Sequence, residues 1–205
     1  MKKKFKNNLI FKEITSCAED QIKKIRDLRN LENIRKFMYT DHIITEQEHL
    51  NYITKLKNDK KNLVFIVFNH TNQIIGLVSL NSIDKLHKKA DWAFYTNPEI
   101  KNIGAVIEYY FIEFFFNQLN FEKLNCEVIE NNISTQKLHK KFLFEEEGIK
   151  KENIIKDHKR IDVHLYGLTK SNWDKRKFEL SKFNSFFNKY SVKFEFNKNF
   201  LNQNE

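Results

Sequence analysis

Apolar positions along the first sixty residues recur at two different spacings. Leu9 to Ile14 is a short run of β-branched and aromatic side chains that predicts a strand. Over 19–30 the apolar residues fall three and four positions apart, the period of an amphipathic helix, and a second short helix is expected over 33–39. Thr45 and Glu48 have the spacing of a capping box, so a third helix should begin there and run to about residue 58.

After residue 60 the pattern becomes that of short strands, with two further helices between them. Strands are expected over 63–68, 74–82, 90–95, 123–129, 144–151 and 160–168, and helices over 107–120 and 134–141. The first two of these strands are separated by a segment of hairpin length, which predicts antiparallel pairing. The order of elements therefore indicates an α/β (α+β) domain with about seven strands.

The composition of the chain shifts only after Thr169. We therefore expect a folded domain over 1–169 and a basic, Phe-rich C-terminal extension over 170–205, which carries seven of the 20 Phe residues. The partly helical spacing of its apolar residues is compatible with docking on the domain, on a second copy in a homodimer, or on a partner protein, and its basic excess also suits an anionic membrane surface. Because an exposed aromatic stripe favours aggregation, we expect the extension to dock.

The net charge of +9 lies entirely at the two ends of the chain. Residues 1–12 carry five Lys and no acidic residue, whereas 13–169 carry equal numbers of basic and acidic residues. A nucleic-acid-binding domain needs its basic residues clustered on the fold, so nucleic acid is not expected as a partner. The apolar stretch after Lys6 is too short for a signal peptide, and no stretch approaches the ~18 apolar residues of a membrane span, so we expect a cytoplasmic protein.

The cysteine and histidine content argues against structural metal or disulfides. Cys17 and Cys126 are the only cysteines, and no pair of His or Cys residues has the spacing of metal ligands. We expect two free thiols and no metal, with Cys126 in the core.

The first candidate site is a polar loop that leads into the long apolar helix, made of Lys101, Asn102, Ile103, Gly104 and Ala105. Such a junction can bind an anion, because free backbone N–H groups and the positive end of the helix dipole meet there. The loop is equally compatible with a strand-to-helix turn that merely needs one glycine.

The second candidate is Glu130, at the end of the strand expected over 123–129. Strand alternation places it on the same face as Cys126 and Val128, so that it extends an apolar row. Such surroundings would raise the pKa of the carboxyl group and suit it to proton transfer. A solvated carboxylate at the end of a strand is the alternative.

These segments, in this order of strands and helices, resemble the GCN5-related N-acetyltransferase (GNAT) family over roughly residues 9–168. The pyrophosphate loop of the family, Q/R-x-x-G-x-G/A, stands here as Lys101-x-x-Gly104-x-Val106, and its N-x-x-A-x-x-x-Y motif stands as Asn132-x-x-Thr135-x-x-x-His139. The resemblance implies a mixed, mostly antiparallel sheet flanked by helices, with acetyl-CoA as the acetyl donor. The chain departs from the family at Lys101, at Val106 and at His139, which replaces the usual Tyr.

The resemblance also implies roles for individual residues. The loop over 101–105 would hold the pyrophosphate, Asn132 the pantetheine arm, and the strand that splays after Tyr95 would present a backbone N–H to the thioester oxygen. His139 would protonate the departing thiolate, since imidazole is a competent acid near neutral pH; a degenerate site or a water acid are the alternatives. Glu130 would accept the proton of the attacking amine, and the acetyl group would pass directly, without a cysteine nucleophile.

The first third of the chain resembles one subgroup of the family, which acetylates a UDP-4-amino-4,6-dideoxy sugar in pseudaminic acid biosynthesis. The residues that carry this resemblance include Arg29, Asn30, Met38, Tyr39, His49 and Ser79. They imply that a UDP-linked 4-amino sugar is the acceptor, with an apolar wall of Met38 and Tyr39 against its methyl group. Arg29 is equally compatible with a structural ion pair, and Met38 and Tyr39 with ordinary core positions.

Two other functions fit the same motifs. A GNAT domain that acts on a protein N-terminus or another small amine would acetylate that amine and ignore nucleotide sugars. A non-catalytic domain would bind acetyl-CoA without transferring its acetyl group to any amine.

Overall fold

The computed structural model describes residues 7–197 and contains almost every element that the sequence predicts. In chain order the elements are β1 (Asn7–Glu13), η1 (Ile14–Ser16), α1 (Glu19–Asn30), α2 (Glu32–Arg35), α3 (Glu46–Leu56), β2 (Leu63–Phe68), β3 (Ile74–Asp84), β4 (Lys89–Thr96), α4 (Ile103–Asn117), β5 (Lys123–Ile129), α5 (Ile133–Lys141), β6 (Glu145–Lys156), β7 (Lys159–Thr169), α6 (Lys170–Arg176), η2 (Lys177–Phe183), α7 (Asn184–Phe187) and β8 (Tyr190–Glu195). The Lys-rich start of the chain and the last eight residues of the C-terminal extension lie outside the described residues.

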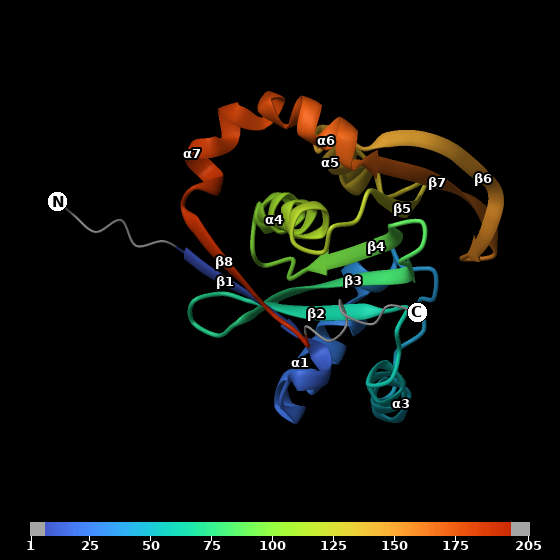
Figure 1. Ribbon diagram of the computed structural model, residues 1–205. Helices are drawn as coiled ribbons and strands as arrows, with labels where there is room; N and C mark the ends of the chain where they lie inside the picture. The colour runs from blue at the N-terminus through green and yellow to red at the C-terminus, as the bar shows by residue number, and fades with distance from the viewer. Residues whose placement is uncertain (1–6, 198–205) are drawn as a thin grey trace.

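The strands form one mixed sheet in the order β6-β7-β5-β4-β3-β2-β1-β8. The β4–β5 and β1–β8 pairs are parallel and the remaining pairs are antiparallel, which confirms the expected mixed, mostly antiparallel sheet. Helix α4 covers one face of the sheet, and α1 and α3 lie on the other (Figure 1). Because both faces are covered, β2 is buried along its whole length and reads as an unbroken apolar run.

Each face of the sheet has its own apolar core. On one face Phe111 of α4 packs with Phe65 and Trp92 of the strands. On the other face Ile25 of α1 and Ile53 of α3 belong to a separate buried cluster with residues of β2. The site described below opens between strands that border the first of these cores.

The C-terminal extension contributes an eighth strand, where about seven were expected. From β7 it arches around α4 and returns as β8 beside β1 (Figure 1). Phe194 of β8 stacks on Phe114 of α4 with 3.7 Å between ring centroids, and on Phe11 of β1 with 4.4 Å. The extension therefore docks on its own domain. The helix suggested by its Phe spacing is wrong over 190–195, because this segment pairs with the distant strand β1 and takes a strand conformation.

Helix α4 begins at Ile103, four residues earlier than the sequence predicted. The expected loop is correspondingly shorter, because Ile103, Gly104 and Ala105 form the first turn of the helix rather than a loop. Asn102 immediately before it has a left-handed backbone, with φ of 62°. That conformation turns the chain sharply between Pro98 and the helix, and it leaves the helix N-terminus at the end of β4.

Candidate active site

The site lies where two neighbouring parallel strands separate. Strands β4 and β5 pair only from Lys89–Lys123 to Asp91–Asn125, and beyond that register they diverge. A cavity of about 350 Å³ opens between them and is lined by Phe37, Met38, Tyr39, Asn81, Asp91, Trp92, Ala93, Phe94, Cys126, Glu127, Val128, Ile129, Asn132, Thr135 and His139. The divergence begins at Asp91, well before Tyr95, where the sequence analysis had placed it.

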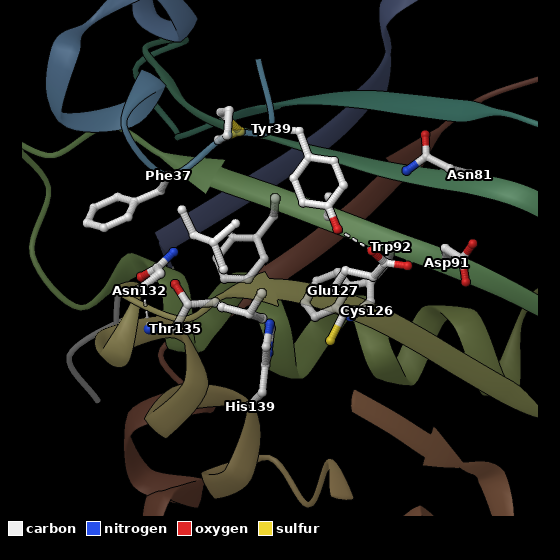
Figure 2. Close-up of a pocket in the computed structure, with 15 residues that line it drawn as sticks. Phe37, Tyr39, Asn81, Asp91, Trp92, Cys126, Glu127, Asn132, Thr135 and His139 are labelled. Carbon is white, nitrogen blue, oxygen red and sulfur yellow. Dashed lines mark hydrogen bonds between the residues drawn. The ribbon is translucent and has the colours of Figure 1, made fainter. Parts of the chain in front are cut away.

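Two groups of side chains face each other across this cavity. Phe37 and Tyr39, from the segment between α2 and α3, lie on one side, and Asn132, Thr135 and His139 of α5 and its start lie on the other (Figure 2). Asn132 caps α5, its Oδ1 accepting a hydrogen bond of 3.3 Å from the backbone N–H of Thr135. This cap fixes where α5 begins. His139 lies two helical turns after Asn132, on the same side of the cavity.

Glu127 of β5 is one of two carboxylates that line the cavity, the other being Asp91. Its Oε2 accepts a hydrogen bond from the hydroxyl of Tyr39, and its Oε1 pairs with Nζ of Lys150 at 2.5 Å. Burial alone would raise the pKa of Glu127, but the bonds from Lys150 and Tyr39 outweigh it and hold that pKa below its usual value. The Tyr39 hydroxyl has a raised pKa, caused by burial and by this carboxylate, and stays protonated.

His139 is buried at the floor of the cavity and is paired with an acid. Its Nδ1 lies 2.7 Å from Oε1 of Glu108, a residue of α4 with no exposed surface. Burial would lower the pKa of His139, but the charge of Glu108 raises it well above the usual value. Nδ1 is taken by Glu108, and the imidazole also interacts with the thiol of Cys126, another residue of the cavity lining.

The start of α4 has the features expected of an anion site. Lys101 and Asn102 are exposed just before the first helical turn, where backbone N–H groups are free. Gly104 is required neither by its φ, which is not positive, nor by packing, because a Cβ there would meet Leu138 and Phe94 at an ordinary 3.6 Å. The glycine is therefore not explained by the turn alone, whereas the close approach of a ligand to this backbone would explain it.

The residues expected to bind substrate divide into two groups. Met38 and Tyr39 line the cavity, whereas Arg29 and Asn30 hold the segment that carries them. Nη2 of Arg29 donates to the carbonyl of Thr40 at 2.9 Å, and the amide of Asn30 exchanges two hydrogen bonds with the backbone of Ile44. The ion pair considered for Arg29 is not observed in the described residues: Nη1 is buried with no hydrogen-bond partner, and burial lowers the pKa of the guanidinium.

Four other predicted residues are not among those that line the cavity. Tyr95 packs with the apolar cluster on the α1 side of the sheet, and His49 lies half-buried on α3, where burial lowers its pKa. Ser79 contacts the cavity lining through another residue: its Oγ accepts a hydrogen bond of 3.1 Å from the side-chain amide of Asn81, which lines the cavity. Glu130 follows the end of β5, and its backbone is held by Gln136 and Asp162.

Three acids of the site are not among the residues predicted from the sequence: Asp91 and Glu127, which line the cavity, and Glu108, which contacts His139. Strand alternation puts Glu127 on the face opposite Cys126, yet both residues line the cavity where β4 and β5 separate. Glu108 had a detectable signal, as an acidic residue inside an otherwise apolar helical pattern. Among residues 7–197 no group of three or more His, Cys, Asp or Glu side chains is arranged to hold a metal ion.

Comparison with known proteins agrees with this geometry. The acetyltransferase (GNAT) domain model matches residues 14–165. The chain belongs to the GNAT family. It is also 34% and 32% identical over 96 residues to acetyltransferase PseH from two Campylobacter jejuni strains, serotypes O:2 and O:23/36. That stretch covers 47% of this chain, and the chain spans only 59% of the length of each of these relatives.

Solved structures of GNAT enzymes share the fold. Spermidine N-acetyltransferase from Vibrio cholerae, in complex with CoA and spermine, superposes with a TM-score of 0.74 at 22% identity, over 80% of this chain and 97% of the other. A dodecameric form of the same enzyme superposes with a TM-score of 0.68, over 82% and 97%. Within residues 7–197 no helix is both long and apolar enough to cross a membrane.

Proposed function

We propose that this GNAT protein transfers the acetyl group of acetyl-CoA to the 4-amino group of a UDP-linked 4-amino-4,6-dideoxy sugar. The observation that carries the proposal is the cavity between β4 and β5, which is lined by both Glu127 and His139. The similarity to acetyltransferase PseH and the subgroup residues Arg29, Asn30 and Met38 support the choice of a nucleotide sugar.

The residues at the start of α4 suit the coenzyme, which supplies the acetyl group as a thioester. Lys101 and the free N–H groups of the first turn would hold the pyrophosphate, with Gly104 allowing it to approach the backbone. Asn132 lies along the cavity wall, where it would bind the pantetheine arm. The backbone of β4 beyond Asp91, released from pairing with β5, would offer an N–H to the thioester oxygen.

The amine must lose a proton as it attacks, and we assign that proton to Glu127. Its carboxylate lines the cavity and stays ionised, whereas Glu130 lies beyond the strand end and outside the cavity lining. The structure therefore favours Glu127 over Glu130 as general base, either directly or through one water molecule. His139, at the opposite wall, would protonate the departing thiolate.

The acceptor sugar would lie against the segment between α2 and α3. Phe37, Met38 and Tyr39 present an apolar surface on that side of the cavity, as a sugar with a methyl in place of a hydroxyl group requires. Arg29 and Asn30 hold this segment through its backbone carbonyls, so we give them a role in positioning it. His49 and Ser79, which lie outside the cavity lining, would act at the edge of the acceptor site.

A cationic amine is a second candidate acceptor. Among the described residues that line the cavity, Asp91 and Glu127 are acidic and none is Lys or Arg. This excess of acidic over basic residues in the lining favours an acceptor with several positive charges, such as the polyamine bound by the Vibrio cholerae enzyme.

One experiment separates these functions. The full chain is incubated with acetyl-CoA and either the UDP-4-amino-4,6-dideoxy sugar, spermidine, or a peptide with a free N-terminus, and both thiol release and acceptor mass are followed. We expect thiol release matched by a gain of one acetyl group on the sugar. Transfer to spermidine or peptide alone would replace the sugar as acceptor, and tight acetyl-CoA binding without any transfer would show a binding domain.

A further inference from the structure

A carboxylate inside the apolar core contacts the proposed acid of the site. Glu108 lies on α4 with 0% of its surface exposed, and its Oε1 is 2.7 Å from Nδ1 of His139, which is 3% exposed. The second oxygen of Glu108 has no hydrogen-bond partner among the described residues. An ionised carboxylate in such surroundings is costly unless it is paired, so an apolar residue would serve the packing of α4 better.

We propose that Glu108 is the positioning residue of His139, holding the imidazole by Nδ1 so that a protonated Nε2 is delivered to the cavity. The inference rests on the proposed function, because it explains how His139 could act as the acid of acetyl transfer. Among residues 7–197 the one hydrogen bond observed for the Glu108 carboxyl group joins Oε1 to the His139 ring, so His139 accounts for the place of Glu108.

The surroundings of His139 explain why the ring needs this partner. Trp92, Phe94 and Phe144 have ring centroids between 5.1 and 6.0 Å from that of the imidazole. In such an apolar niche a lone histidine would be neutral at pH 7, because burial lowers its pKa. A tyrosine, which the family usually has at this position, carries its own proton at that pH, whereas a histidine keeps an acidic proton on Nε2 only if a neighbouring charge stabilises the imidazolium.

Three further polar groups surround the pair. The thiol of Cys126 on β5 lies beside the imidazole and has a pKa raised by burial, so it stays protonated. The hydroxyl of Tyr166 on β7 donates to Gln136 of α5 at 3.4 Å, and Lys140 lies 5.6 Å from the centre of the Tyr166 ring. Glu108 is the acidic partner of the pair: burial raises the pKa of its carboxyl group, and the charge of His139 and the hydrogen bond between them oppose that rise.

Acetyl transfer at this site moves two protons. The amine nitrogen forms a bond to the acetyl carbon, the bond between that carbon and the coenzyme sulfur breaks, and the sulfur keeps the electron pair of the broken bond. The proton on Nε2 passes to that sulfur, which leaves a neutral imidazole whose Nδ1–H still donates to the Glu108 carboxylate. The amine nitrogen gives its proton to Glu127, which releases it to solvent, and His139 recovers a proton from solvent.

The test begins with the parent protein, without any ligand. Nitrogen NMR of His139 should show an imidazolium at pH 7.5, and the ring should titrate above the usual pKa of a histidine, about 6.5. In Glu108→Gln, which keeps volume and an acceptor oxygen, the ring should titrate at least about two pH units lower. A neutral imidazole in the parent at pH 7.5, or the same titration in both proteins, would overturn the proposal whether or not the protein transfers acetyl groups.

Kinetics then distinguish positioning from a merely structural role. Glu108→Gln should lower kcat about tenfold to a hundredfold, with the KM for acetyl-CoA within about twofold. In a His139→Tyr background, which has its own acidic proton, the same change should cost less than about threefold. Glu113→Gln on the same helix is the control. Equal losses of kcat in the parent and His139→Tyr backgrounds would show that Glu108 serves folding alone. Absence of turnover with every amine would remove the proposed function, and the NMR titration would still test whether Glu108 holds His139.

Discussion

The hydroxyl of Tyr39 donates a hydrogen bond to the carboxylate of Glu127, a residue 88 positions away in the chain. The bond joins the segment between α2 and α3 to strand β5 across the mouth of the cavity (Figure 2). Through it, the segment that would contact the sugar also helps to keep the proposed base ionised. In the proposed function, acceptor binding and proton removal would therefore depend on the same pair.

Replacing Glu127 tests its role as base. Glu127→Gln should lower kcat by about a hundredfold, because the amide cannot accept the proton of the attacking amine, while the KM for acetyl-CoA stays within about twofold. Glu130→Gln is the matched control, because Glu130 is a nearby carboxylate outside the cavity lining, and it should retain turnover within about twofold. A large loss in Glu130→Gln with an active Glu127→Gln would return the role to Glu130.

The ion pair between Lys150 and Glu127 predicts a pH effect. Lys150 lowers the pKa of Glu127 against the effect of burial, so Lys150→Met should raise that pKa. The base would then become protonated at a higher pH, and the acid limb of the kcat/KM profile should move up by about one unit. Lys151→Met is a control, since Lys151 pairs instead with Asp162. A profile unchanged by Lys150→Met would separate Glu127 from the rate-limiting proton transfer.

Gly104 should respond to substitution with opposite effects on stability and binding. Its backbone is helical and a Cβ would fit at 3.6 Å from its neighbours, so Gly104→Ala should raise the free energy of unfolding by about 0.5–1 kcal/mol. If the coenzyme pyrophosphate approaches this backbone, the same methyl group should weaken acetyl-CoA binding at least about tenfold.

Urea unfolding and calorimetric titration of the Gly104→Ala protein with acetyl-CoA measure the two effects. Gly148→Ala on β6 is the control, because a Cβ there would also meet only an ordinary contact, Leu165 at 3.9 Å, and no coenzyme site is proposed nearby. A more stable Gly104→Ala protein with unchanged acetyl-CoA affinity would place the pyrophosphate elsewhere.

The C-terminal extension should contribute to the stability of the domain. Phe194 stacks on Phe114 and Phe11, so Phe194→Ala should lower the free energy of unfolding by about 2–3 kcal/mol. Phe178→Ala is the control within the same extension, since Phe178 is 69% exposed, and should change it by less than about 0.5 kcal/mol. Equal urea midpoints for the two variants would show that β8 is not part of the cooperative fold.

The local sequence was sufficient for most of the secondary structure. The capping box of Thr45 and Glu48 forms as predicted, with the Thr45 N–H donating to Glu48 at 2.7 Å and the Glu48 N–H donating back at 3.2 Å. The helical period of α1 and the apolar runs of β2 and β3 were recognised for the same reason, because caps and periodicity are short-range signals. The motif around Asn132 and His139 also placed both residues on the cavity wall.

Only the tertiary structure decided the features that depend on distant partners. Strand β8 exists because it pairs with β1, and its Phe spacing alone is compatible with a helix. Glu127 enters the site because β4 and β5 stop pairing after Asp91, which no alternation in β5 reveals. The role proposed for Glu108 depends on its contact with His139, 31 residues away in the chain. The local sequence does not show this contact, and the energy of a buried charge depends on what surrounds it.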